Sequence, residues 1–310
     1  ENKVVRVVDF LVNSSLVSRA SDESLRVTNL GKRVASLYVD PLTAQRLISG
    51  VLQSIGKDKF PAITEFSFLH LFATVPDMQR LRIKASDFDA LEQMAKESEQ
   101  TFLTEMPTSH DVRYERLLME VQTARILVLW IEEADPQKIL DSGRIDLGDL
   151  NRLIDTSNWI AYSCRSLARE LRETARRSSD IKLTVLSTLD LDPQIILNRL
   201  HYLESFLESL EIRLKYGIRS DLTKLIQVKY IGRVRARALA EAGITFEDLP
   251  NCTLERLSTI RSIGSGIAKL ILSQAVGPSD DDEEQYSAPT EVKRKAAFSM
   301  RKKRIEEFFN

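Results

Sequence analysis

Two short segments near the C-terminal end of the sequence have residue types and spacing suited to binding phosphate. The segment at 263–270 reads Ile-Gly-Ser-Gly-Ile-Ala-Lys-Leu, the turn pattern of a helix-hairpin-helix. Its glycines permit a tight turn, and the backbone N–H groups that follow begin a helix, which is a natural phosphate site. The segment at 231–239 keeps one glycine, has Val234 in place of the other, and adds arginines at alternate positions. The residues predicted to contact a nucleic-acid backbone are Gly232, Arg233, Arg235, Arg237, Gly264, Gly266 and Lys269.

The local charge supports this interpretation. Residues 212–276 contain 11 Lys or Arg and 5 Asp or Glu, a formal excess of six positive charges in a chain whose net charge is −1. A basic patch on a phosphate-binding turn indicates contact with DNA or RNA. The alternative is a pair of packed helical hairpins with solvated arginines. Two hairpins and a charge excess in the same segment favour the nucleic-acid interpretation.

A second candidate site is the pair Arg152 and Trp159 on a helix predicted at 149–177. At about 100° per residue, these two side chains lie opposite the apolar face of that helix. An aromatic ring beside an arginine suits base stacking and phosphate contact with a single strand. From the helical wheel alone, packing of Trp159 against a neighbouring helix explains the pattern equally well. The apolar face consists of Leu150, Leu153, Ile154, Ser157, Ala161, Cys164, Ala168 and Leu171.

We find no catalytic centre, metal site or resident cofactor in the sequence. Neither Gly31-Lys32 nor Gly56-Lys57 is preceded by the glycine that a G-x-x-x-x-G-K-[ST] phosphate loop requires. The cysteines, Cys164 and Cys252, are far apart and fit neither a metal site nor a disulfide framework, which suggests a reducing cytoplasm. The histidines are isolated, and no combination of side chains suggests a nucleophile with its base.

The elements that must position these residues are mostly helices. A helix at 3–13 precedes two short strands at 16–19 and 25–28, a pattern typical of a winged helix. We therefore predict a mainly α fold with a winged helix and small β-hairpin at 1–40 and a helical bundle at 41–216. A helix-hairpin-helix module at 217–277 and a disordered tail at 278–310 complete the predicted organisation.

The composition of the 310 residues fits a protein that buries a core, with 43 % hydrophobic and 29 % charged residues. No apolar run approaches the roughly 20 residues that span a bilayer, so no membrane association is predicted. The chain begins at Glu1 and enters an apolar pattern at once, which suggests a piece of a longer protein.

The tail ends with a possible partner-binding motif. Ile305, Phe308 and Phe309 stand at positions that one helical turn places on one side. Exposed aromatic residues in a disordered terminus suggest docking into a groove of a partner. The spacing resembles the box by which replication proteins bind the sliding clamp, with Lys302 in place of the usual glutamine.

Several segments, in order, resemble the archaeal HelQ-like repair helicases of superfamily 2, within the Ski-type and Sec-type group. The resemblance covers about residues 1–277 and departs from a common family pattern at Val75, where threonine is frequent. The matching stretches are Thr28–Val34, Tyr38–Thr43, Leu69–Leu71, Val75–Met78, Leu129–Glu133, Gly148–Leu150 with Trp159, and Ile231–Gly243.

This resemblance implies two RecA-like motor domains upstream, which would use ATP and Mg, so this region should be inactive alone. It implies a ratchet helix whose arginine and tryptophan, mapped onto Arg152 and Trp159, touch the translocating strand. The arginine-rich hairpin maps onto Arg233, Arg235 and Arg237. The family unwinds forked DNA in the three-prime to five-prime direction, so the expected partners of this chain, as a monomer, are single-stranded and forked DNA. Two alternatives stay open: a stand-alone nucleic-acid-binding module and a relative directed at RNA.

Overall fold

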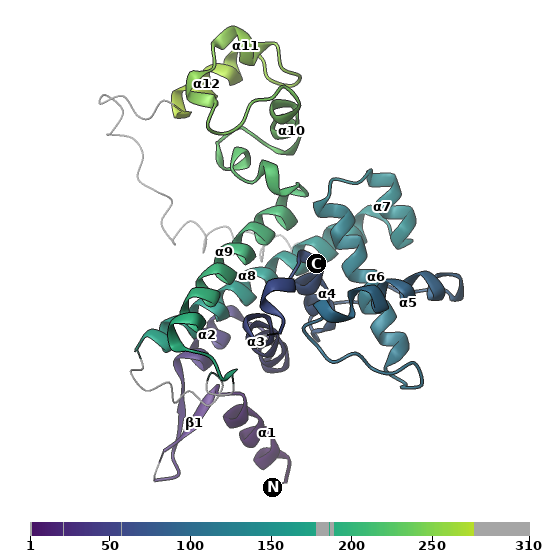
Figure 1. The fold of residues 1–310 in the computed structure, drawn as a ribbon, viewed down its shortest axis with the longest axis vertical. Coiled ribbons are helices and arrows are strands. Elements are labelled where there is room, and N and C mark those ends of the chain that lie inside the picture. Colours follow the sequence, from purple (N-terminus) through teal and green to yellow (C-terminus); the bar gives the residue numbers. More distant parts are fainter. Residues whose placement is uncertain (1, 21, 57, 178–185, 187–188, 276–310) are drawn as a thin grey trace, which may run out of the picture. The chain divides into compact units, whose positions relative to one another are not determined.

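The structure is a computed structural model that describes residues 2–20, 22–56, 58–177, 186 and 189–275. The chain forms two compact units, Glu1–Thr223 and Lys224–Asn310, and each is described by itself. The described residues are mainly helical, with one two-stranded antiparallel sheet (Figure 1). The predicted fold class is therefore confirmed. No helix within the described ranges is long and apolar enough to cross a membrane.

The first unit opens with a helix, a hairpin and a second helix. Helix α1 (Asn2–Asn13) precedes β1 (Val17–Arg19) and β2 (Leu25–Val27), and Val17 pairs with Val27 across the sheet. Helix α2 (Asn29–Leu37) begins where the Thr28 hydroxyl accepts a hydrogen bond from the backbone N–H of Gly31. A side chain at Gly31 would overlap the carbonyl of Leu16, so glycine lets α2 approach the hairpin. This is the predicted order of elements, and its assignment as a winged helix stays a prediction.

Seven further helices follow in the described part of the same unit. Pro41 stands in the first turn of α3, and the Asp40 carboxylate accepts a hydrogen bond from the N–H of Leu42 at 2.7 Å. Single 3₁₀ turns lie at Phe60–Ala62, Ala85–Asp87, Glu99–Thr101 and Ser220–Leu222. The helices are α3 (Pro41–Ile55), α4 (Glu65–Thr74), α5 (Phe88–Ser98), α6 (Tyr114–Ile131), α7 (Pro136–Gly143), α8 (Leu147–Arg177) and α9 (Pro193–Tyr216).

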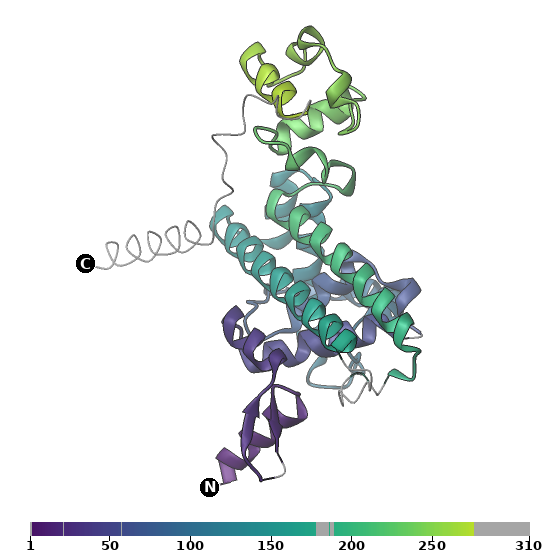
Figure 2. The same ribbon diagram turned by 90° about the vertical axis from the view of Figure 1, so that its left-hand side faces the viewer.

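Helix α8 is the central element of the first unit. It packs along α9 and also contacts α2, α3 and α4, and α8 and α9 run side by side in both views (Figures 1 and 2). All residues of the predicted apolar face of α8 are buried. Ser163, one turn after Trp159, is buried as well, and its hydroxyl donates to the carbonyl of Trp159 at 2.8 Å. A helix that packs against several neighbours buries more than one face, so the helical wheel predicted fewer buried residues on α8 than the structure has.

Ion pairs fix α9 against the other helices. Arg165 and Arg172 of α8 pair with Glu211 at 2.9 Å and with Glu204 at 2.7 Å on α9. Arg213 of α9 is 3 % exposed and pairs with Glu65 at the start of α4 and with Glu132 just after α6. These contacts hold the exposed surface of α8 in a rigid frame.

The second unit consists of short helices. Helix α10 (Arg233–Glu241) is followed by α11 (Leu254–Ser258) and α12 (Ser265–Ala275), and α12 packs against α11. Single 3₁₀ turns lie at Leu225–Gln227 and Leu249–Asn251. The unit's core includes Ile231, Leu239, Leu257, Ile263 and Ile271.

Candidate nucleic-acid interface

Arg152 and Trp159 project from the N-terminal half of α8, where the predicted strand contact should lie. Asp146 precedes the helix, and its carboxylate accepts a hydrogen bond from the N–H of Asp149 at 2.8 Å, which stabilises the first turn. Arg152 is exposed, and no hydrogen bond or ion pair joins its side chain to another described residue. Its guanidinium is therefore available to an anion from outside.

Trp159 has a different environment. It is half-buried against the core of the first unit, and its indole N–H donates to the carbonyl of Leu37 at 3.3 Å. Leu37 ends α2, so Trp159 joins α8 to the N-terminal helix-and-hairpin segment. Packing of Trp159 against a neighbouring helix is therefore observed, and stacking of a base on its ring stays a prediction.

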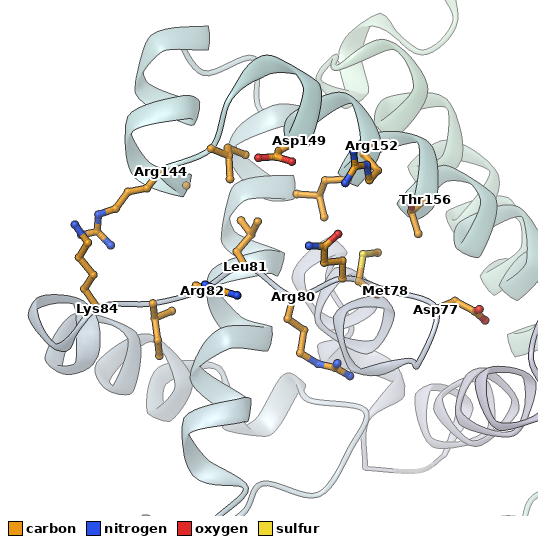
Figure 3. A pocket seen from close by; sticks show the side chains of 15 residues that line it. Asp77, Met78, Arg80, Leu81, Arg82, Lys84, Arg144, Asp149, Arg152 and Thr156 are labelled. Carbon is orange, nitrogen blue, oxygen red and sulfur yellow. The ribbon is translucent and has the colours of Figure 1, made fainter. Parts of the chain in front are cut away.

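Arg152 lines a hollow of about 530 Å³ in front of α8 (Figure 3). One side is formed by α8 with Asp149, Arg152 and Thr156, and the facing side is the segment 77–84 that follows α4. Five cations and two carboxylates line it. They are Arg80, Arg82, Lys84, Arg144 and Arg152, with Asp77 and Asp149.

Two of these cations are already neutralised. Arg80 donates to Glu120 at 3.0 Å, and Arg144 pairs with Asp87 through both carboxylate oxygens. The Arg144 guanidinium and the N–H of Lys84 hold the pKa of Asp87 well below its usual range. Arg82 and Lys84 were not singled out in the sequence, although cations alternate with apolar residues along Arg80–Lys84. This alternation is the sequence pattern by which Arg82 and Lys84 could have been identified.

The second unit contains two hairpins with the same local geometry. Tyr230 and Ser262 each stand two residues before a glycine and have positive φ, +72° and +67°. Ile231 and Ile263, the next residues, are buried, and α10 and α12 begin just after Gly232 and Gly264. A side chain at Gly232, Gly264 or Gly266 would meet nothing within 4 Å. These glycines therefore leave the first turns of α10 and α12 open to solvent. The left-handed backbone conformation of each hairpin belongs to Tyr230 or Ser262 and not to the glycines.

The arginines of α10 do not share one environment. Arg235 donates to the carbonyl of Tyr230 at 2.7 Å and to the carbonyl of Ser262 at 2.9 Å, which ties the two turns together. Its guanidinium is therefore engaged within the protein. Arg233 and Arg237 are half-buried, and Lys269 on α12 is exposed. The predicted tail motif, Lys302, Ile305, Phe308 and Phe309, lies outside the described residues.

Comparison with known proteins defines the class of this chain. Residues 66–185 match the family described as archaeal helicase, domain 4, a range that contains both Arg152 and Trp159. The bundle around α8 is thus similar to this domain of archaeal helicases.

Curated relatives carry the name ATP-dependent DNA helicase Hel308. The protein of Methanocella arvoryzae is 30 % identical over 271 residues, which cover 86 % of this chain and 32 % of the relative. The protein of Methanocaldococcus jannaschii is 32 % identical, and the match covers 80 % of this chain and 17 % of that relative. The protein of Thermococcus kodakarensis is 29 % identical, and the match covers 85 % of this chain and 21 % of that relative. The chain is thus similar to archaeal DNA helicases over most of its own length, and it spans a third or less of the length of these relatives.

Proposed function

We propose that this chain is the C-terminal, DNA-handling region of an ATP-dependent DNA helicase. The whole protein would move three-prime to five-prime along single-stranded or forked DNA in replication-coupled repair, as a monomer in the cytoplasm. The observation that carries the proposal is Arg152, an exposed guanidinium without a partner among the described residues, on a helix that also presents Trp159. A cation beside an aromatic ring supports phosphate contact together with base stacking.

ATP and Mg are assigned to a motor outside this chain. Gly31 lies within α2 against the Leu16 carbonyl, and Gly56 ends α3 with its N–H bonded to the carbonyl of Gln53. Neither glycine therefore forms a phosphate-binding loop. In this proposal, the residues of the chain hold the strand and take no part in hydrolysis.

Binding of the 310-residue chain to labelled forks tests the proposal. We expect a DNA fork with a single-stranded arm to bind more tightly than blunt duplex DNA, and Arg152→Gln to weaken that binding. Tighter binding to a matched RNA fork would favour an RNA-directed relative. An upstream reading frame without a phosphate loop would favour a stand-alone binding module instead.

The C-terminal residues support a separate proposal for a partner. Ile305, Phe308 and Phe309 have the spacing of a sliding-clamp motif, with Lys302 at the glutamine position. Calorimetry of a 296–310 peptide with the clamp at about 100 μM tests it, because a coupled-folding motif should still release heat at that concentration. Replacing both phenylalanines with alanine should abolish the heat, and Lys302→Gln should increase the affinity. Absence of heat would exclude the motif.

A further inference from the structure

The hollow in front of α8 has a second basic wall, formed by the segment Gln79–Lys84. Arg82 and Lys84 are exposed, and no ion pair or side-chain hydrogen bond joins them to a described residue. They line the same hollow as Arg152, on the side opposite α8 (Figure 3). Three uncompensated cations thus face one space from two separate elements.

The segment that carries these cations is held in place at Leu81, Ile83 and Lys84. The N–H of Leu81 donates to the Thr123 hydroxyl at 2.9 Å, and the N–H of Lys84 donates to Asp87 at 2.9 Å. Leu81 and Ile83 are half-buried against the apolar clusters of the unit. Arg82 and Lys84 alternate with Leu81 and Ile83 along the segment. The two cations are two residues apart, which corresponds to roughly 6.5 Å in an extended backbone. A rigid backbone with cations at this spacing is preorganised for a chain of phosphates.

We propose that Gln79–Lys84 forms the second wall of a single-strand path, in which Arg82 and Lys84 contact backbone phosphates opposite Arg152. The proposal rests on the proposed function and adds residues to it. Asp77 and Asp149 also line the hollow and would repel phosphates near them. The strand should therefore follow the cations, with its phosphates near Arg82, Lys84 and Arg152.

The dependence of single-strand binding on salt tests this wall. Each phosphate contact to a single strand contributes about 0.7 to the slope of log K against log salt. The double variant Arg82→Gln/Lys84→Gln of the 310-residue chain should flatten that slope by about 1.4. The control Lys3→Gln/Lys138→Gln removes the same charge from exposed lysines that do not line the hollow, and it should leave the slope nearly unchanged.

The outcomes separate this inference from the proposed function. An unchanged slope in the Arg82/Lys84 variant, with weaker binding still caused by Arg152→Gln, overturns the second wall and leaves the proposed function in place. Equal flattening in the control overturns the wall too, because total charge then explains the effect. If the unaltered chain binds no single strand, both proposals fail.

A second inference rests on a separate observation, the conformation of Tyr38. Tyr38 is 89 % exposed and forms the left-handed C-cap of α2, with a φ of +57°. The preceding carbonyl, that of Leu37, accepts the Trp159 indole, and the N–H of Asp40 lies 3.4 Å from a carboxylate oxygen of Asp77 in the hollow. Tyr38 therefore stands between Trp159 and one end of the hollow. A large aromatic side chain at this exposed position contributes little to packing, so its ring is available for a base to stack on.

We infer that a base of the bound strand stacks on Tyr38. Tyr38→Gly should weaken binding of a single strand roughly 5- to 150-fold, the range expected for loss of one stacked base, without lowering the melting temperature. Tyr38→Phe should bind as the unaltered chain does. A single strand with abasic sites throughout separates the two inferences. Tyr38→Gly should no longer weaken binding of this strand, whereas the Arg82/Lys84 variant should still weaken it. Unchanged binding of the intact strand to Tyr38→Gly would overturn the role of Tyr38.

Discussion

The indole N–H of Trp159 on α8 donates a hydrogen bond to the carbonyl of Leu37, the last residue of α2, at 3.3 Å. The two residues are 122 positions apart in the sequence. The bond fixes the orientation of the ring while part of the ring stays exposed. Trp159 therefore combines a structural contact with a surface on which a base can stack.

Substitutions of Trp159 should separate these two contributions. Trp159→Phe removes the hydrogen bond and keeps an aromatic face, so the free energy of unfolding should fall by about 1 kcal/mol with most strand binding retained. Trp159→Ala should also weaken single-strand binding by roughly 1–3 kcal/mol. Urea unfolding and strand titrations measure the two effects. Strand binding by Trp159→Ala that equals that of the unaltered chain would show that the ring only packs.

Arg235 and Lys269 should respond differently to substitution. Arg235 bridges the carbonyls of Tyr230 and Ser262, so Arg235→Ala should lower the free energy of unfolding of the second unit by roughly 1.5–3 kcal/mol. Lys269→Ala, at an exposed position, should instead flatten the slope of log K against log salt for single-strand binding by about 0.7. Thermal unfolding and salt titrations of both variants distinguish the roles. A reduced salt slope in Arg235→Ala at unchanged stability would contradict the bridging role.

His70 should make stability depend on pH. Its ring is fully buried and stacks on Phe102 at 4.1 Å between centroids, and neither ring nitrogen has a hydrogen-bond partner among the described residues. Burial lowers the pKa of His70 to about 3, from about 6.5 in the unfolded chain. Between these values the unfolded chain binds a proton that the folded chain does not. The contribution of His70 is therefore complete above pH 6.5 and is lost as pH falls toward 3.

Urea unfolding across pH 7 to 4 measures this effect. The unaltered chain should lose up to about 1.4 kcal/mol per pH unit through this residue. His70→Leu should remove that part of the slope, and His110→Gln, an exposed histidine, serves as the control. Identical slopes in the unaltered chain and His70→Leu would show that His70 is not the source.

Gly217 should tolerate no side chain, because its backbone conformation and its surroundings both require glycine. Its φ is +62°, and a Cβ would lie 2.5 Å from the Trp130 ring, whose N–H donates to the carbonyl of Leu214 at 2.7 Å. Gly243 has a similar φ of +68° with nothing within 4 Å, so Gly243→Ala measures the backbone cost of about 1–2 kcal/mol. Gly217→Ala should cost roughly 1–3 kcal/mol more through overpacking. Equal losses in the two variants, measured by thermal unfolding, would exclude the contact with Trp130.

Local patterns in the sequence were sufficient to predict the main helices and strands and their order along the chain. Proline at the start of α3, the 3.6-residue period of α8 and the short alternating strands act within a few residues, so they can be recognised without tertiary information. The same holds for the two glycine hairpins, whose spacing places each glycine at the start of a helix. The family resemblance rested on such local segments, and the comparisons confirmed it.

Tertiary contacts decided which side chains are available to bind a strand. Arg235 was predicted to bind phosphate like its neighbours, but the fold brings the Ser262 carbonyl, 27 positions away, within its reach. Trp159 was open to two interpretations because a helical wheel does not include α2. Arg82 and Lys84 became candidates only when the fold placed their segment opposite Arg152. A sequence pattern shows which residues share a helix or strand, whereas the partner that neutralises a charge or covers a ring comes from distant parts of the chain.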